Sequence, residues 1–307
     1  MLKTTLSLSL LAILLAFSAV AVKPQDMSEY YTVSQPDEFD IDWGSFYNRM
    51  NEHTARVREQ FPHYLDLNYG TDAKQRLDVY LPKGRIANAP VFLFVHGGGF
   101  REGDKMHYGS VAEPFVKSGV ITVATSYRLT GSGAHYPDQP DDVKSAIKWI
   151  FDNIEQYGGN PENIHVAGHS AGAVLTADIG VDRAWLGQMG MPKDILNSIM
   201  PISGPYDIRV KRRPGQLDAY APTPELREQA SPILKINDPV PAALVATGSE
   251  EEYVEPSLDF ANALTAAGVD AHYLLLEGED HADTALLLAD ENSELFKRVI
   301  AMILGQK

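Results

Sequence analysis

The chain of 307 residues contains no cysteine. This absence excludes disulfide bonds, thiolate zinc sites and a cysteine nucleophile. Basic residues are also scarce, because 26 lysines and arginines stand against 41 aspartates and glutamates, which gives a formal net charge of −15. Nucleic-acid binding requires a basic surface that faces the phosphates, so no nucleic-acid partner is expected.

Long hydrophobic runs are missing except at the N-terminus. There, Lys3 precedes an apolar run over residues 6–17, and Ala19-Val20-Ala21 follows as a small-residue cleavage site. This pattern predicts a secretory signal peptide over residues 1–21. The run is short for a membrane-spanning helix, and no later stretch is long enough to cross a bilayer. We therefore expect a secreted or periplasmic protein, cleaved near Ala21, with no stable membrane anchor.

No linker rich in proline, serine or glycine divides the remaining chain, and its length suits one large core. From about Arg76, strand-like and helix-like segments alternate, which indicates an α/β fold with a mostly parallel central sheet flanked by helices. The aromatic-rich residues 22–66 and the proline-rich residues 205–240 do not fit the alternation. Both are candidates for a small cap over the open end of the sheet. We predict an N-terminal cap or extension over 22–66 and the main domain over 67–307.

Hydrophobic periodicity predicts the elements of this domain. Continuous apolar runs indicate buried strands, and apolar residues at helical spacing indicate helices with one buried face. Strands are expected at residues 91–95, 120–124, 164–167, 199–202, 242–247 and 272–276. Helices are expected at residues 142–154, 171–179 and 257–267, and around residues 296–303 near the C-terminus.

The segment around Ser170 carries the most specific functional signal. Its sequence, GHSAG at 168–172, matches G-x-S-x-G, with a predicted strand before it and a predicted helix after it. A strand that turns directly into a helix strains the serine backbone, and the glycines on either side leave room for the turn. The turn exposes the hydroxyl, and the helix directs its positive end toward the site. Ser170 is therefore the predicted nucleophile, with an ordinary serine in a glycine-rich turn as the alternative.

A second glycine-rich segment, HGGGF at 96–100, directly follows a predicted strand. Glycines allow backbone N–H groups to approach a developing negative oxygen closely, as an oxyanion hole requires. A nucleotide-binding loop is the rival interpretation. The pattern G-x-G-x-x-G would require glycine at position 102, where the chain has Glu102, and no G-K-S/T sequence is present. We therefore expect no nucleotide cofactor.

The base that activates Ser170 must be one of nine histidines. In this class of site the order along the chain is serine, acid, histidine, and catalytic groups gather at the carboxyl ends of the strands. His281 follows the last predicted strand and is the predicted base. His165 and His169 are four residues apart, but they flank a strand and a turn and do not share a helix face, so no metal site is expected.

The acid that orients His281 should follow the strand that ends near Thr247. The chain offers three carboxylates there, Glu250, Glu251 and Glu252. One carboxylate must accept the Nδ1–H of the histidine and stabilise the imidazolium. Spacing alone does not choose among the three, and Asp280 and Asp283, in the loop of the histidine itself, are further candidates.

Taken together, these residues resemble the esterase and lipase branch of the α/β-hydrolases over most of residues 76–304. The likeness is to hormone-sensitive-lipase-like carboxylesterases, bacterial feruloyl-esterase-like proteins and arylformamidases. The matching phrases are LDVYLP at 77–82, HGGGF at 96–100, SYRL at 126–129, YGGNPENIHVAGHSAGA at 157–173, ISGPYD at 202–207 and the loop before His281. Lipase-like relatives often continue after SYRL with Ala-Pro-Glu, and this chain departs from them with TGSG at 130–133.

The resemblance implies an α/β-hydrolase fold and specific roles for several residues. In such families the backbone N–H after the serine, here that of Ala171, joins those of two loop glycines. By position these glycines are Gly98 and Gly99, with Gly97 as a further candidate. The acid usually stands three residues after a glycine that closes its strand, which selects Glu251 in this chain. Many relatives have aspartate at that position.

The implied function is hydrolysis of a small-molecule carboxylic ester, small or aryl, through an acyl-enzyme formed on Ser170, with no cofactor. An arylformamidase or amidase would use the same residues, because the same triad also expels amines. An alternative of another class is a non-catalytic hydrolase-like binding protein. Such proteins typically lose the serine or the histidine, and this chain keeps both.

Overall fold

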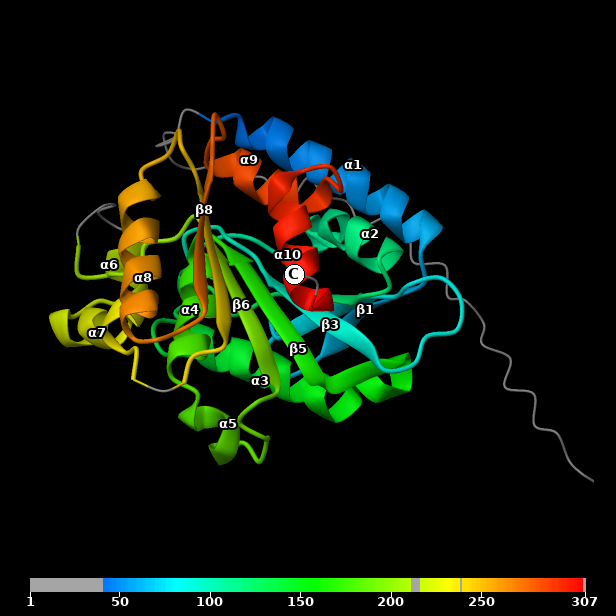
Figure 1. Cartoon of the computed structure of the whole chain (residues 1–307), viewed down its shortest axis with the longest axis horizontal. Helices are drawn as coiled ribbons and strands as arrows, with labels where there is room; N and C mark the ends of the chain where they lie inside the picture. Colours follow the sequence, from blue (N-terminus) through cyan, green and yellow to red (C-terminus); the bar gives the residue numbers. More distant parts are fainter. Residues whose placement is uncertain (1–40, 211–215, 238, 306–307) are drawn as a thin grey trace, which may run out of the picture. The chain divides into compact units, whose positions relative to one another are not determined.

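The computed structural model describes residues 41–210, 216–237 and 239–305. The predicted signal peptide, residues 1–21, and residues 22–40 of the predicted extension lie outside these ranges. The described residues form an eight-stranded sheet with helices on both faces, as Figure 1 shows. The predicted mostly parallel sheet with flanking helices is confirmed.

The sheet brings the ends of its parallel strands to one edge. Its strands are β1 (His63–Asn68), β2 (Arg76–Tyr80), β3 (Ala89–Val95), β4 (Ile121–Thr125), β5 (Gly159–His169), β6 (Leu196–Ile202), β7 (Ala242–Gly248) and β8 (Ala271–Leu276). Their order across the sheet is β1-β2-β4-β3-β5-β6-β7-β8. β2 pairs antiparallel with both of its neighbours, and all other pairs are parallel. The strands β3 to β8 therefore present their carboxyl ends at the same edge.

Helices cover the two faces of the sheet in different groups. The helices are α1 (Trp43–Gln60), α2 (Gly109–Lys117), α3 (Asp138–Asn153), α4 (Ala171–Val181), α5 (Ala184–Gln188), α6 (Gln216–Tyr220), α7 (Pro224–Gln229), α8 (Val254–Ala266), α9 (His281–Leu286) and α10 (Glu294–Leu304). α3 and α4 pack on one face, and α1, α2, α9 and α10 pack on the other (Figure 1). No helix within the described ranges combines the length and the apolar character needed to cross a membrane.

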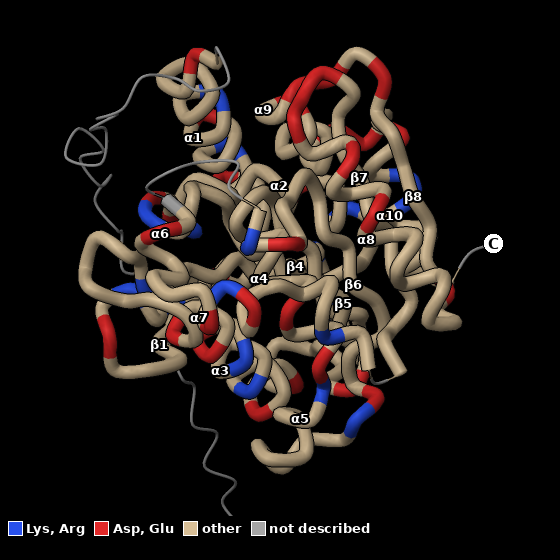
Figure 2. The backbone as a smooth tube through the Cα atoms, turned by 90° about the vertical axis from the view of Figure 1, so that its left-hand side faces the viewer, with Lys and Arg blue, Asp and Glu red and all other residues tan. Residues whose placement is uncertain are grey.

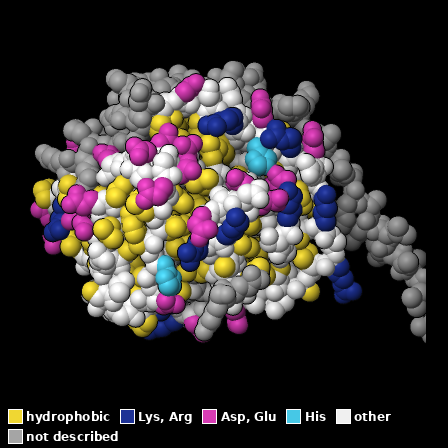
Figure 3. Space-filling model, turned by 45° about the horizontal axis from the view of Figure 1, so that its top comes forward, with side chains coloured by type: hydrophobic (Ala, Val, Ile, Leu, Met, Phe, Trp, Pro, Cys, Tyr) yellow, Lys and Arg dark blue, Asp and Glu magenta, His cyan; other side chains and the backbone are white. Residues whose placement is uncertain are grey.

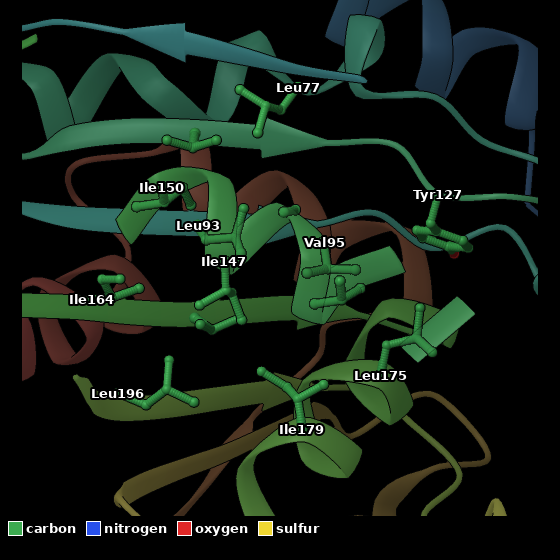
Figure 4. Packing of buried hydrophobic residues seen from close by; sticks show 14 of the residues in the cluster. Leu77, Leu93, Val95, Tyr127, Ile147, Ile150, Ile164, Leu175, Ile179 and Leu196 are labelled. Atoms are coloured by element: carbon green, nitrogen blue, oxygen red, sulfur yellow. The ribbon is translucent and has the colours of Figure 1, made fainter. Parts of the chain in front are cut away.

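Strand β3 shows why the predicted strands are continuous apolar runs. Leu93 and Val95 belong to the core cluster under α3 and α4, and Figure 4 shows both beside Ile147 of α3. The alternate residues Phe92 and Phe94 belong to the cluster on the opposite face. Because successive side chains of a strand point to opposite faces, a strand that is covered on both faces needs apolar residues at every position.

The N-terminal edge of the sheet was not predicted. β1 alternates between partly exposed and exposed residues, so it lacks the apolar run that marks the inner strands. The sequence predicts a domain boundary between residues 66 and 67, and β1 contains both of these residues. The sheet therefore includes residues of the predicted extension as well as of the main domain. α1 packs against α2, and the buried Thr54 hydroxyl donates a 3.1 Å hydrogen bond to the carbonyl of His107 and accepts one from Ser110 N.

The described residues of the predicted cap segment 205–240 pack on the loop that follows β3. The ring of Tyr220, at the end of α6, stacks on Phe100 with centroids 3.6 Å apart. The backbone N–H of Tyr136 donates a 2.7 Å hydrogen bond to the carbonyl of Tyr220. Lys235 forms an ion pair with the buried Asp178 of α4. The segment is therefore tied both to the glycine-rich loop and to the helix that follows Ser170.

Buried histidines make the stability of the fold depend on pH. Burial lowers the pKa of His165 from its ordinary value of 6.5 to about 4. Between these pH values the unfolded chain binds more protons than the folded chain, so the free energy of unfolding falls as the pH falls. We expect His165→Gln to reduce this slope by up to about 1.4 kcal/mol per pH unit, one proton's contribution. Chemical denaturation between pH 4 and 7 measures the slope.

The control for this prediction is His272→Gln, because the side chain of His272 is 64% exposed. We expect this variant to keep the pH dependence of the wild-type protein. Equal slopes for His165→Gln and the wild-type protein would show that the buried ring does not produce the effect.

Candidate active site

The three predicted triad residues come from three different strand ends. Ser170 follows β5, Glu251 lies in the turn after β7, and His281 begins α9 after β8. The parallel strands bring these ends to one edge, where polar groups of α/β proteins gather. Ser170 Oγ lies 3.0 Å from His281 Nε2. On the other side of the ring, His281 Nδ1 lies 2.5 Å from Glu251 Oε2.

Ser170 occupies a sharp turn between a strand and a helix. β5 passes into α4 through this one residue, which has φ 57° and ψ −119°. A residue with a side chain is strained in this region of backbone space. A Cβ on Gly168 would lie 2.2 Å from the carbonyl oxygen of Gly172, and a Cβ on Gly172 would lie 2.1 Å from that of Val95. The two glycines therefore let the turn pack against its own helix and against β3, as the G-x-S-x-G pattern predicts.

The Glu251 carboxylate is buried and fully hydrogen-bonded. Its Oε1 atom accepts hydrogen bonds from Ser203 Oγ at 2.6 Å, Thr247 Oγ1 at 2.8 Å and Gly248 N at 2.9 Å. Burial by itself raises the pKa of a carboxyl group. Here the hydrogen bonds, together with the charge of His281, outweigh burial and lower the pKa of Glu251 to about 2. The carboxylate is therefore ionised at neutral pH and directs its second oxygen at the histidine.

The other candidate acids lie in different surroundings. The side chain of Glu250 is exposed, and its Oε1 lies 3.3 Å from Ser249 Oγ. Asp280 and Asp283 form a capping box at the start of α9, in which each side chain accepts from the backbone of the other residue. Among the contacts of the described residues, the carboxylate that reaches His281 Nδ1 is that of Glu251.

The backbone of His281 is held by two side chains that the sequence interpretation missed. His169 Nε2 lies 2.8 Å from the carbonyl oxygen of His281, so this nitrogen carries the proton and donates it. Burial lowers the pKa of His169 to about 3, which keeps its ring neutral. Thr284 Oγ1 also donates to the same carbonyl, at 3.0 Å. His169 stands within the G-x-S-x-G pattern, but the pattern does not indicate which atom its ring would contact.

The glycine-rich loop lies directly against the serine. A Cβ on Gly97 would come within 3.0 Å of Ser170 Cβ. Gly98 has φ 114°, and a Cβ there would lie 2.2 Å from a backbone oxygen. Within the described part of the chain, the N–H groups of residues 97–99 and Ala171 donate to no backbone oxygen. Gly97 thus lies beside Ser170, and Ala171 follows the serine directly in the chain.

The surroundings of His281 are aromatic and acidic. The ring centroids of Tyr253 and Trp43 lie 5.3 Å and 6.5 Å from that of His281, so α1 reaches the site with its first residue. Figure 2 shows acidic residues concentrated on the loops beside α9, β7 and β8. Figure 3, in which the top of Figure 1 comes forward, shows acidic side chains among hydrophobic ones. The turn of Glu251 also contains Glu250 and Glu252, and the loop before His281 together with the first turn of α9 contains Glu277, Glu279, Asp280 and Asp283.

Metal binding is not indicated by the part of the chain that the structure describes. No group of three or more histidine, aspartate or glutamate side chains there is arranged to hold an ion. His165 and His169, four residues apart, contact different groups, since His165 Nδ1 lies 2.7 Å from Ser198 Oγ and His169 faces the backbone of His281.

The sheet order and the strand-to-helix turn at Ser170 define an α/β-hydrolase, so the predicted fold is confirmed. The family model BD-FAE matches residues 77–264. The match spans more than half of the chain, and the chain belongs to the BD-FAE family.

Known proteins with similar sequences include two kinds of hydrolase. A probable isoprenylcysteine alpha-carbonyl methylesterase of Arabidopsis thaliana is 27% identical over 266 residues, which cover 77% of this chain and 55% of the relative. A kynurenine formamidase of Danio rerio is 27% identical over 257 residues, which cover 81% of this chain and 85% of the relative. The match thus spans about half the length of the methylesterase and most of the formamidase.

Solved structures agree on the fold. Esterase B from Lactobacillus rhamnosis superposes with a TM-score of 0.71 at 17% identity, and the match covers 86% of this chain and 93% of that protein. At this identity the likeness shows the fold alone. The family match places the chain in the BD-FAE family, and its sequence relatives include a probable methylesterase and a formamidase.

Proposed function

We propose that the chain hydrolyses carboxylic esters of small molecules with a triad of Ser170, His281 and Glu251. The continuous line of contacts through the triad carries this proposal. Ser170 Oγ lies 3.0 Å from His281 Nε2, and His281 Nδ1 lies 2.5 Å from Glu251 Oε2. A serine becomes a nucleophile when a base is within hydrogen-bond reach, and the base needs an acid on its other nitrogen.

In the first half of the proposed reaction, His281 Nε2 takes the Ser170 proton while Oγ attacks the carbonyl carbon of the ester. The carbonyl oxygen becomes an oxyanion, which backbone N–H groups stabilise. The proposed donors are Ala171, Gly98 and Gly99, with Gly97 as a further donor. The imidazolium then gives its proton to the departing alkoxide, so an alcohol leaves and the acyl group stays on Ser170.

In the second half, a water molecule gives a proton to His281 Nε2 and attacks the acyl-enzyme. Collapse of this intermediate returns the proton to Ser170 Oγ and releases the carboxylic acid. Glu251 keeps its negative charge throughout and stabilises the imidazolium in both halves. The proposed steps need only the triad side chains, the backbone N–H donors and a water molecule as the second substrate.

The proposed oxyanion loop predicts a strong effect of Gly98→Ala. A Cβ at φ 114° is strained and would lie 2.2 Å from the carbonyl oxygen of Glu102, so the backbone of the loop must rearrange at the proposed donors. We expect kcat for p-nitrophenyl acetate to fall by about 10²-fold or more, the effect of losing an oxyanion donor. Gly187→Ala is the control, because a Cβ there meets no atom within 4 Å. Equal kcat values for the two variants would contradict the assignment.

The acidic residues in the loops of Glu251 and His281 predict a preference for uncharged substrates. A negative potential at a site repels anionic substrates, and salt screens the repulsion. We expect p-nitrophenyl pentanoate to have a higher kcat/KM than mono-p-nitrophenyl glutarate, which differs by a terminal carboxylate. The ratio should decrease as salt is added. A ratio that does not respond to salt would show that repulsion does not produce the preference.

A second candidate function is hydrolysis of an aryl formamide or another amide. The similarity to a kynurenine formamidase over 85% of its length favours this candidate. Turnover of p-nitrophenyl acetate, methyl ferulate and N-formylkynurenine by one preparation separates the two functions. We expect the esters to react faster, and preference for N-formylkynurenine would assign the chain as a formamidase instead.

We also propose export to a secreted or periplasmic location. The proposal rests on the sequence of residues 1–21, with a basic residue, an apolar run and a small-residue cleavage site. N-terminal sequencing of the protein recovered from its native cells should begin after Ala21. Recovery of active protein that retains residues 1–21 would contradict cleavage.

A further inference from the structure

Two neighbouring strands are each followed directly by a serine with a positive φ angle. Ser170 follows β5, Ser203 follows β6, and both have φ 57°. Their backbone N–H groups make equivalent bonds to the next strand, since Ser170 N donates to Ile202 O at 2.9 Å and Ser203 N donates to Ala246 O at 2.8 Å. A residue with a side chain persists in this strained region only when its surroundings hold it there. Strain of this kind is found most often at functional sites.

The hydroxyl of Ser203 joins the proposed acid to the helix of the proposed base. Ser203 is fully buried, and its Oγ donates a 2.6 Å hydrogen bond to Glu251 Oε1. The same oxygen lies 2.9 Å from Thr284 Oγ1 in α9. Thr284 Oγ1 in turn lies 3.0 Å from the carbonyl oxygen of His281. The contacts therefore run from the carboxylate through two hydroxyls to the backbone of the histidine.

We propose that Ser203 is a positioning residue, which holds the Glu251 carboxylate so that Oε2 faces His281 Nδ1. This inference rests on the proposed function of the triad. Rotation of a carboxylate about its last side-chain bond is soft, so its orientation depends on the hydrogen bonds that it accepts. Of the three donors to Oε1, Thr247 and Gly248 belong to β7, the strand that leads into the turn of Glu251. Ser203 comes from the neighbouring strand and supplies the shortest of the three bonds.

Removal of the hydroxyl should affect turnover more than substrate binding. Ser203→Ala leaves a strained residue of similar size but takes a hydrogen bond from a buried charge. We expect kcat for p-nitrophenyl acetate to fall by roughly tenfold with KM nearly unchanged, as expected for an interaction that acts in the transition state. Ser203→Gly removes the hydroxyl and the backbone strain together. The same loss is expected, because relief of strain does not restore the hydrogen bond.

Ser198→Ala is the matched control. Ser198 is a buried serine like Ser203 and lies in β6, the strand that Ser203 follows, but its hydroxyl contacts His165. We expect its kcat to equal that of the wild-type enzyme. If Ser203→Ala retains wild-type kcat, or if Ser203→Gly recovers it, the proposed positioning role is wrong.

A double-mutant cycle tests whether Ser203 acts through Glu251. In the Glu251→Ala background no carboxylate remains to be positioned, so adding Ser203→Ala should change kcat by less than about twofold. The same tenfold loss in both backgrounds would overturn the inference, because Ser203 would then act independently of the acid. Wild-type kcat for Glu251→Ala would overturn the proposed triad itself. A damaging Glu251→Ala combined with a silent Ser203→Ala would overturn the role of Ser203 alone.

Discussion

Replacement of Ser170 by alanine is expected to lower kcat for ester hydrolysis by at least about 10⁴-fold, the order of loss when the nucleophile of a serine triad is removed. Ser170 Oγ is the atom that would bond to the substrate carbon, and it lies 3.0 Å from the base. Alanine keeps the small side chain that the turn accepts but carries no oxygen. The variant should therefore fold, bind ester and fail to turn it over.

Covalent labelling gives an independent measurement of the same prediction. A fluorophosphonate probe should label the wild-type enzyme at Ser170 and leave Ser170→Ala unlabelled. Ser145→Ala is the control, because the Ser145 hydroxyl on α3 bonds to the carbonyl of Asp141, away from the triad. It should keep full activity and full labelling. Turnover retained by Ser170→Ala would show that another group is the nucleophile.

Glu251→Gln is expected to lower kcat by about 10²- to 10⁴-fold, the upper value being that seen when the acid of a triad becomes an amide. Three donors surround Oε1 of this side chain, from Ser203, Thr247 and Gly248. They would hold the amide oxygen of the new residue at that position, so its NH₂ group would face His281. Nδ1 must then accept, and the ring proton moves to Nε2. In that tautomer the histidine cannot take the Ser170 proton.

The neighbouring glutamates provide the comparison for this prediction. Glu250→Gln and Glu252→Gln should leave kcat within roughly twofold of the wild-type value, since both side chains are exposed and p-nitrophenyl acetate carries no charge for them to repel. Measurement of kcat for p-nitrophenyl acetate in all three variants ranks the three positions. If Glu252→Gln is the damaging change, the assignment of the acid is wrong by one residue.

Much of the fold could be predicted from the apolar pattern of the chain. The helix expected at 142–154 is α3, with Val143, Ile147 and Ile150 on its buried face. The helix begins earlier, at Asp138, because its first turn is polar and hydrophobic periodicity does not detect it. β5 likewise begins at Gly159, five residues before its apolar core, since its first residues are polar and pair with β3 through an irregular register.

The edge of the sheet shows where this pattern ends. β1 pairs antiparallel with β2 at the edge of the sheet, and its residues alternate between partly exposed and exposed. An edge strand needs no continuous apolar run, so its sequence carries little signal. The predicted boundary between the extension, residues 22–66, and the main domain therefore falls inside β1, a strand of the sheet.

The sequence by itself determined the local chemistry of this protein. It indicated Ser170 as the predicted nucleophile, and it indicated two glycine-rich segments, residues 96–100 and 168–172, as turns. Both conclusions depend on the backbone conformation of a few neighbouring residues. It also placed His281 after the last predicted strand. Each of these conclusions needs only the order of residues along the chain.

Only the tertiary structure decided which side chains meet. Among the three adjacent glutamates it places Glu251, the one that the family resemblance selects, against His281, and it places Ser203 against Glu251. These contacts depend on β6 and β7 lying side by side in the sheet and on the rotation of each loop residue. Residues that are distant in the chain become neighbours through strand pairing, and the spacing of residues contains no record of that pairing.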